Sequence, residues 1–205
     1  MAAKSTFSNM VICLTAVCLV CASVLAAVYA VTYEPIKASA QKAEKAAISE
    51  VLPAGCTVSE AKSCECDGLT YDYYEALEGE AVKAYAVKSA TNGFGGKLQL
   101  MVGVLEDGTV WATKVLSQNE TPGLGAKCAS DEAFCAQWSY EKRQESGKKL
   151  EVLAVSKDGG DVDAITASTI TSRAYTLAVS NAVNVVKSLC GEKVDSWSGA
   201  SVKSE

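Results

Sequence analysis

The sequence predicts an α+β protein with a single N-terminal transmembrane helix, followed by one domain in which helices pack against an antiparallel sheet. Three observations lead to this prediction: an uncharged apolar stretch near the N-terminus, two hairpin patterns in the middle of the chain, and a long amphipathic segment near its end. A chain of 205 residues can hold one ordinary domain with an appended segment, and it is too short for two full-sized domains.

The apolar stretch covers residues 10–31, which contain no charged side chain. A helix through it rises roughly 33 Å, which matches the hydrocarbon core of a bilayer. A cleaved signal peptide is the alternative, but apolar regions of signal peptides are shorter, about 7–15 residues. We therefore expect residues 1–33 to be a retained anchor. Lys4 before the stretch and Glu34 after it favour a cytoplasmic N-terminus, which places the body on the outer face of the cytoplasmic (inner) membrane.

Residues 34–54 carry small and apolar side chains at helical spacing among Lys and Glu. This pattern predicts a juxtamembrane helix that ends near Pro53. Residues 55–68 are rich in Cys, Ser and Asp without periodicity, and we expect a loop there. The folded domain is expected over residues 55–191, followed by a polar tail over residues 192–205.

Two hairpins are expected within the domain. The first joins residues 71–77 to residues 81–87, which are rich in aromatic and β-branched side chains. The second joins residues 98–105 to residues 109–116 through Asp107-Gly108, a turn sequence that tolerates positive φ. Residues 150–155 are expected to form a fifth strand.

Two helices complete the predicted domain. A short one is expected around residues 130–140. A long one begins near Thr169 and stops at Gly191, because glycine readily adopts the left-handed conformation that follows a helix. The long helix has an apolar face that includes Tyr175, Val179 and Val186, and we expect this face to cover the sheet.

Charge and composition exclude several classes of function. The formal net charge is −5, whereas a nucleic-acid-binding domain needs a basic surface. The chain has no histidine and lacks the paired C-x-x-C spacing of zinc sites, so no metal site is expected. Six cysteines outside the anchor could form disulfides in an oxidising compartment, and their pairing stays open: Cys56, Cys64, Cys66, Cys128, Cys135 and Cys190.

A cluster of hydroxyl side chains opens the last predicted helix, in the sequence Asp-Ala-Ile-Thr-Ala-Ser-Thr-Ile-Thr-Ser over residues 163–172. The first turn of a helix has unpaired N–H groups and the positive end of the dipole, so a phosphate is stabilised there. The Thr169 hydroxyl is well placed to hold a phosphoester. The alternative, which local physics alone favours, is that Ser168 or Thr169 caps the helix and contributes about 1 kcal/mol.

Two glycine-containing segments lie ahead of this helix start, on either side of the second hairpin. Residues 120–125 read Glu-Thr-Pro-Gly-Leu-Gly, and the two glycines around the leucine let backbone approach a flat ligand closely. Residues 93–96 read Gly-Phe-Gly-Gly and lie before the second hairpin. Taken alone, each segment could equally be an ordinary loop or turn.

With these three segments in this order, the chain resembles the G subunit of the Rnf complex, a membrane-bound ferredoxin:NAD oxidoreductase that couples electron flow to ion transport. The resemblance covers nearly the whole chain. It implies an FMN linked through its phosphate to Thr169, placed there by a separate flavin transferase that uses FAD. The attachment motif of the family, Asp-x-x-Ser/Thr-Gly-Ala-Thr, falls on residues 163–169, where Ala167 replaces the usual glycine and Ser168 the usual alanine.

The resemblance also implies the function and the site. The chain would be an electron-carrying flavoprotein that works with the other components of a redox complex, and residues 120–125 would form a wall beside the flavin ring. No acid–base residue is expected, because the cofactor itself carries the redox chemistry. The residues expected around the FMN, besides Thr169, are Asp163, Thr166, Ala167, Ser168, Ile170, Thr171, Glu120, Thr121, Gly123, Leu124 and Gly125.

Two other interpretations stay open. The C subunit of the sodium-pumping NADH:quinone oxidoreductase resembles this chain in both the threonine motif and the Glu-Thr-Pro-Gly-Leu-Gly motif, although that family is typically longer. In the second interpretation, the chain is an anchored interaction domain without cofactor, and its hydroxyl cluster only caps a helix.

Overall fold

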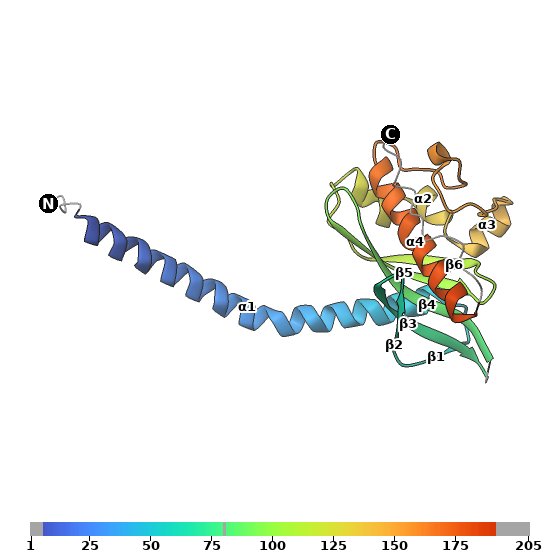
Figure 1. The fold of residues 1–205 in the computed structure, drawn as a ribbon, viewed down its shortest axis with the longest axis horizontal. Coiled ribbons are helices and arrows are strands. Elements are labelled where there is room, and N and C mark those ends of the chain that lie inside the picture. The colour runs from blue at the N-terminus through green and yellow to red at the C-terminus, as the bar shows by residue number, and fades with distance from the viewer. Residues whose placement is uncertain (1–5, 80, 192–205) are drawn as a thin grey trace. The chain divides into compact units, whose positions relative to one another are not determined.

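The structure is a computed structural model that describes residues 6–79 and 81–191. The expected polar tail, residues 192–205, lies outside the described residues. The chain divides into two compact units, residues 1–43 and residues 44–205. Figure 1 shows a helical N-terminal unit and a second unit in which helices cover a sheet.

Residues 7–43 of the N-terminal unit belong to helix α1 (Phe7–Val51), whose remaining residues, 44–51, are part of the second unit. The anchor and the juxtamembrane helix expected from the sequence are therefore one helix, and Pro35 lies inside it. The helix ends close to the expected residue, Pro53. Among the described residues, α1 is the one helix that is long and apolar enough to cross a membrane, with a mean hydropathy of 2.8 over its most apolar window.

The second unit is built on a six-stranded antiparallel sheet, with strands in the order β1-β3-β4-β5-β6 and with β2 also paired to β3. The expected hairpins are present as β3/β4 and β5/β6. The strands are β1 (Thr57–Val58), β2 (Lys62–Cys66), β3 (Leu69–Glu78), β4 (Ala81–Asn92), β5 (Lys97–Leu105) and β6 (Val110–Ser117).

The expected loop over residues 55–68 was wrong, because this segment contains β1 and β2. Asp67 and Gly68 have φ values of 51° and 70° and join β2 to β3 as a two-residue turn, since Cys66 pairs directly with Leu69. Asp-Gly is a favoured sequence for such turns. The sequence does not predict these two strands, because most of their side chains are exposed. They therefore lack the alternation of apolar and polar residues that is typical of a half-buried strand.

The strand expected over residues 150–155 is also absent. The segment forms an irregular loop with one isolated bridge, between Val155 and Val162. The Asp161 carboxylate accepts hydrogen bonds from the N–H groups of Glu151 and Val152, at 2.9 and 2.7 Å. A side chain thus takes two donors that a strand would offer to a neighbouring strand.

The short helix expected around residues 130–140 is two helices. They are α2 (Glu132–Ala136) and α3 (Tyr140–Ser146), and a 3-10 helix, η1 (Gly125–Ala129), precedes them. A further 3-10 turn, η2 (Ser156–Asp158), follows. The Asp131 side chain accepts from the N–H of Phe134 and starts α2, as expected for an N-cap aspartate.

Helix α4 (Thr169–Leu189) confirms the long C-terminal helix. Gly191, with φ of 79°, follows its end as expected. The apolar face of α4 packs on the sheet, where Tyr175 and Val179 are almost fully buried. Trp138 is fully buried beside Tyr175, with ring centroids 5.2 Å apart. This face holds the larger of two hydrophobic clusters.

The last turns of α1 contribute to the smaller cluster. Ala47, Ile48 and Val51 are buried in one cluster with small or flexible side chains of the sheet, Ala76, Ala84, Ala86 and Met101. A side chain at Gly103 would overlap the carbonyl oxygen of Val51, so only glycine lets the helix approach this closely. Because residues 44–51 belong to the second unit, they are part of the domain rather than a spacer before it.

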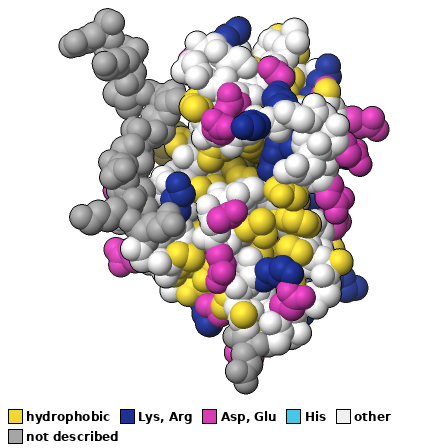
Figure 2. All heavy atoms as spheres, turned by 90° about the vertical axis from the view of Figure 1, so that its right-hand side faces the viewer, with side chains coloured by type: hydrophobic (Ala, Val, Ile, Leu, Met, Phe, Trp, Pro, Cys, Tyr) yellow, Lys and Arg dark blue, Asp and Glu magenta, His cyan; other side chains and the backbone are white. Residues whose placement is uncertain are grey.

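The surface is mixed in charge. On the face shown in Figure 2, basic and acidic side chains are interspersed around hydrophobic patches. The ion pair between Lys114 and Glu50, at 2.6 Å, lies at an exposed position, where such a pair contributes little to stability. All nine cysteines are free thiols.

Candidate functional site

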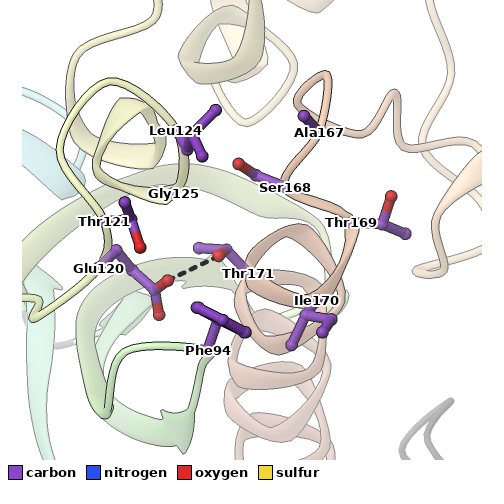
Figure 3. A pocket seen from close by; sticks show the side chains of 10 residues that line it. All are labelled: Phe94, Glu120, Thr121, Leu124, Gly125, Ala167, Ser168, Thr169, Ile170 and Thr171. Carbon is purple, nitrogen blue, oxygen red and sulfur yellow. Dashed lines mark hydrogen bonds between the residues drawn. The ribbon is translucent and has the colours of Figure 1, made fainter.

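A cavity of about 360 Å³ lies at the start of α4. Three segments surround it: the turn between β4 and β5, the loop after β6, and the first residues of α4 (Figure 3). It brings together all of the expected site residues except Asp163, Thr166 and Gly123. The lining residues are Phe94, Glu120, Thr121, Leu124, Gly125, Ala167, Ser168, Thr169, Ile170 and Thr171.

Glu120 ties the three segments together. Its side chain is only 6% exposed, and its Oε2 accepts a hydrogen bond of 2.8 Å from the Thr171 hydroxyl on α4, drawn as a dashed line in Figure 3. Its Oε1 accepts from the backbone N–H of Gly95 at 3.3 Å. A buried carboxyl without partners would be costly, so these bonds fix the loop against both neighbours.

The glycines of the site are required by close packing. A Cβ at Gly125 would lie 2.5 Å from Glu120 Oε2 and 2.7 Å from Thr171 Oγ1. A Cβ at Gly95 would overlap the backbone carbonyl of Asn119. The two glycine motifs found in the sequence therefore allow the segments to meet around Glu120.

The start of α4 has an unusual conformation. Ala167 has φ of 61°, in the left-handed region that an L side chain rarely adopts. Ser168 is the N-cap residue, but its side chain makes no capping hydrogen bond. Its hydroxyl is buried and has no hydrogen-bond partner. The interpretation in which Ser168 caps the helix was therefore wrong.

The other hydroxyls of the helix start are used differently. The Thr171 hydroxyl binds Glu120. The Ser172 hydroxyl accepts from the N–H of Ile165 and donates to the carbonyl of Ser168, at 2.9 and 3.0 Å. Thr169 is the first residue of α4 and is partly exposed. Figure 3 shows the Ser168 side chain pointing toward Leu124 and that of Thr169 pointing the other way.

Exposed hydrophobic side chains surround the cavity. Phe94, Leu124 and Ile170 are 69%, 43% and 54% exposed, and each comes from a different one of the three segments. Sequence analysis noted the Gly-Phe-Gly-Gly turn but did not assign Phe94 to the site. The signal was available, since a large aromatic between glycines in an exposed turn has no core to enter.

Comparison with known proteins shows which family this chain belongs to. Residues 93–184 match the family described as the FMN-binding domain, and residues 1–51 match the RnfG N-terminal region. The G subunit of the proton-translocating ferredoxin:NAD(+) oxidoreductase complex of Clostridium ljungdahlii is 35% identical over 183 residues, 88% of this chain and 91% of that protein. The G subunit of the ion-translocating oxidoreductase complex of Vibrio atlanticus is 32% identical over 180 residues, 81% of this chain and 84% of that protein. The chain belongs to the RnfG family.

This membership confirms the resemblance drawn from the three motifs. Together with the apolar helix α1, it makes this RnfG family member a single-pass, membrane-anchored flavoprotein. The FMN-binding match begins at Gly93 and includes all three segments of the cavity.

The residues around the cavity fit an FMN. The first-turn N–H groups of α4 suit a phosphate, and the exposed hydrophobic side chains suit a flat aromatic ring. The buried Ser168 hydroxyl lacks a partner that a polar ligand atom could supply. The cavity volume of about 360 Å³ lies within the usual range for small-molecule sites.

Three expected site residues lie elsewhere. Asp163 and Thr166 line a neighbouring cavity of about 260 Å³. Lys148 Nζ donates to Asp163 Oδ2 at 2.6 Å and holds the pKa of that carboxyl below its usual value. Gly123 has φ of 78° and open space beside it. Asp163 thus fastens the chain ahead of α4, and Gly123 shapes the loop.

Cys128, in η1, belongs to the core behind the site. It is fully buried, and burial raises the pKa of its thiol to about 11. A thiol with this pKa stays protonated at neutral pH and is a poor nucleophile. The structure therefore gives Cys128 a packing role.

Proposed function

We propose that this RnfG family member carries electrons on an FMN linked through its phosphate to Thr169, within a membrane complex that couples ferredoxin:NAD electron transfer to ion translocation. The observation that supports the proposal is the convergence of the two glycine motifs and the hydroxyl-rich helix start on one cavity. These segments are far apart in the sequence, and each contributes an exposed hydrophobic side chain beside the cavity.

Thr169 is a better acceptor than Ser168. Ser168 is 7% exposed, whereas Thr169 is partly exposed, and a transferase has to reach the hydroxyl that it modifies. In the transfer, the Thr169 oxygen bonds to the phosphorus of the FMN half of FAD and its proton passes to solvent, while the bond to the AMP half breaks and AMP leaves. The product carries the mass of one FMN less one water.

The residues around the cavity would hold the FMN in three ways. The free N–H groups at the start of α4 stabilise the phosphate. Phe94, Leu124 and Ile170 provide apolar walls for the ring, and Glu120 keeps the loop with Leu124 against α4 through its bond to Thr171. When bound, FMN supplies the electron-transfer chemistry, and the protein supplies position and shielding from water.

Further assignments complete the proposal. Asp163, Thr166 and Gly123 would act by shaping the segments on either side of the cavity. A flavin transferase would mature the chain, and the domain would lie on the outer face of the cytoplasmic membrane. The other proteins of the complex would supply and accept the electrons.

The test is Thr169→Val in the full chain, co-expressed with a flavin transferase and purified in detergent. We expect the unchanged chain to carry one FMN by intact mass, located at Thr169 by mapping the peptide that ends at Arg173. Thr169→Val should lose the FMN and its in-gel fluorescence while keeping the unfolding temperature of flavin-free protein. Thr169→Ser is the matched control and should stay modified. In-gel flavin fluorescence that persists in Thr169→Val would overturn the assignment.

A further inference from the structure

Ser168 carries one of the few unsatisfied polar groups of the protein interior. Among the described residues, three buried side-chain polar atoms have no hydrogen-bond partner: Ser89 Oγ, Trp138 Nε1 and Ser168 Oγ. Of these, Ser168 Oγ belongs to a residue that lines the cavity at the start of α4. A buried hydroxyl without a partner destabilises the protein that contains it, so an unused donor at a ligand cavity needs an explanation.

The local backbone keeps the Ser168 hydroxyl from making the usual capping hydrogen bond. An N-cap serine normally has an extended backbone, and its oxygen accepts from an N–H in the first turn of the helix. Ser168 instead has φ of −134° and ψ of 41°, and it follows the left-handed Ala167. Its own N–H and carbonyl are already bound, to Ile165 and to Ser172. The hydroxyl is therefore held away from the cap position.

The direction of the side chain indicates which part of a ligand it meets. Figure 3 shows Ser168 pointing toward Leu124, while Thr169 points the other way. The Thr169 hydroxyl would therefore hold a phosphate in a different direction from that of the Ser168 hydroxyl. The space beside Ser168 is bounded by Leu124 and Gly125, which offer an apolar surface suited to a flat ring.

We propose that the Ser168 hydroxyl donates a hydrogen bond to a polar edge atom of the isoalloxazine ring. This inference rests on the proposed function. It makes Ser168 a cofactor-binding residue of this chain. A donor at the ring edge stabilises the reduced, more electron-rich ring, so the bond should raise the midpoint potential.

The test compares unchanged chain and Ser168→Ala, each produced with and without the flavin transferase. Without flavin, Ser168→Ala should raise the unfolding temperature, because it removes an unsatisfied buried group. With flavin, it should lower the unfolding temperature by about 2–4 °C, since it removes one hydrogen bond. The flavin midpoint potential should become more negative, and the visible absorption of the flavin should shift.

Ser172→Ala is the matched control. Its hydroxyl lies one turn along α4 and has both partners within the chain, so its loss should lower the unfolding temperature equally with and without flavin. Equal effects of Ser168→Ala on the two forms would overturn the proposal. So would an unchanged potential and spectrum, which would place the contact on the ribityl chain or phosphate, or failure of Ser168→Ala to accept FMN. If the unchanged chain carries no FMN at Thr169, the proposed function fails instead.

Discussion

Replacing Gly125 by alanine tests whether the packing around Glu120 holds the cavity together. The new Cβ would lie 2.5 Å from Glu120 Oε2 and 2.7 Å from Thr171 Oγ1, and these two atoms already form a buried hydrogen bond of 2.8 Å. Both side chains would have to move, and the bond between them would break. Overpacking costs about 1–3 kcal/mol, and a lost hydrogen bond costs about 0.5–1.5 kcal/mol more.

The expected loss is therefore about 2–4 kcal/mol of unfolding free energy, or roughly 4–16 °C in unfolding temperature for a protein of this size. The assay is urea and thermal unfolding of the full, flavin-free chain in detergent. Tryptophan fluorescence reports the transition, because Trp138 is fully buried against Phe134 and Tyr175.

A double-mutant cycle with Thr171→Ala is the control. In that background Oγ1 and the hydrogen bond are already gone, so Gly125→Ala should cost at least about 1 kcal/mol less, as expected for residues in contact. A cost of Gly125→Ala below about 0.5 kcal/mol, the usual scatter for surface changes, would refute this account of the packing. So would equal costs in the two backgrounds.

Three further predictions concern the surroundings of the site. Ala167→Gly should stabilise the protein by up to about 1 kcal/mol in urea unfolding, because relief of about 1–2 kcal/mol of left-handed strain exceeds the entropy cost of glycine; a destabilised variant would contradict this. Arg143→Met should cost about 2–4 kcal/mol in the same assay, since the guanidinium is buried and donates to the carbonyls of Val110 and Gln137 at 2.5 and 3.0 Å; near-wild-type stability would mean that water replaces it. Two backbone N–H groups lower the pKa of Asp161, so its stabilisation is present above the ordinary value of about 3.9 and is lost as pH falls through the lower folded value. The urea midpoints of Asp161→Asn and unchanged protein should therefore converge in acid, and a constant difference down to acid pH would exclude this role.

The elements that sequence analysis predicted correctly are those with a strong local signal. The Asp107-Gly108 turn and the apolar face of α4 needed no tertiary information. Strands β1 and β2 were missed because their side chains are mostly exposed. Residues 150–155 have the composition of a strand, but the Asp161 side chain binds the donors that pairing would need.

The candidate site was predictable as a set of motifs but not as an arrangement. Nothing in the sequence pairs Glu120 with Thr171, which lie 51 positions apart. The motif predicts Asp163 at the cofactor, and in the structure its carboxylate accepts hydrogen bonds from Lys148 and Ser156. The Gly-Phe-Gly-Gly sequence alone predicts a flexible turn and does not show that Phe94 lies beside the cavity. The contacts of Glu120 with Thr171 and of Asp163 with Lys148 join segments that only the folded chain brings together.

The end of α1 packs on the sheet, and this packing limits how far the N-terminus can be truncated to obtain a soluble fragment. A truncation at residue 55, which the expected domain boundary suggests, would remove Ala47, Ile48 and Val51 and expose to water the sheet residues that they cover. Newly exposed apolar surface of this kind promotes aggregation. A soluble fragment should therefore start ahead of Glu44, so that it retains the last turns of the anchor helix.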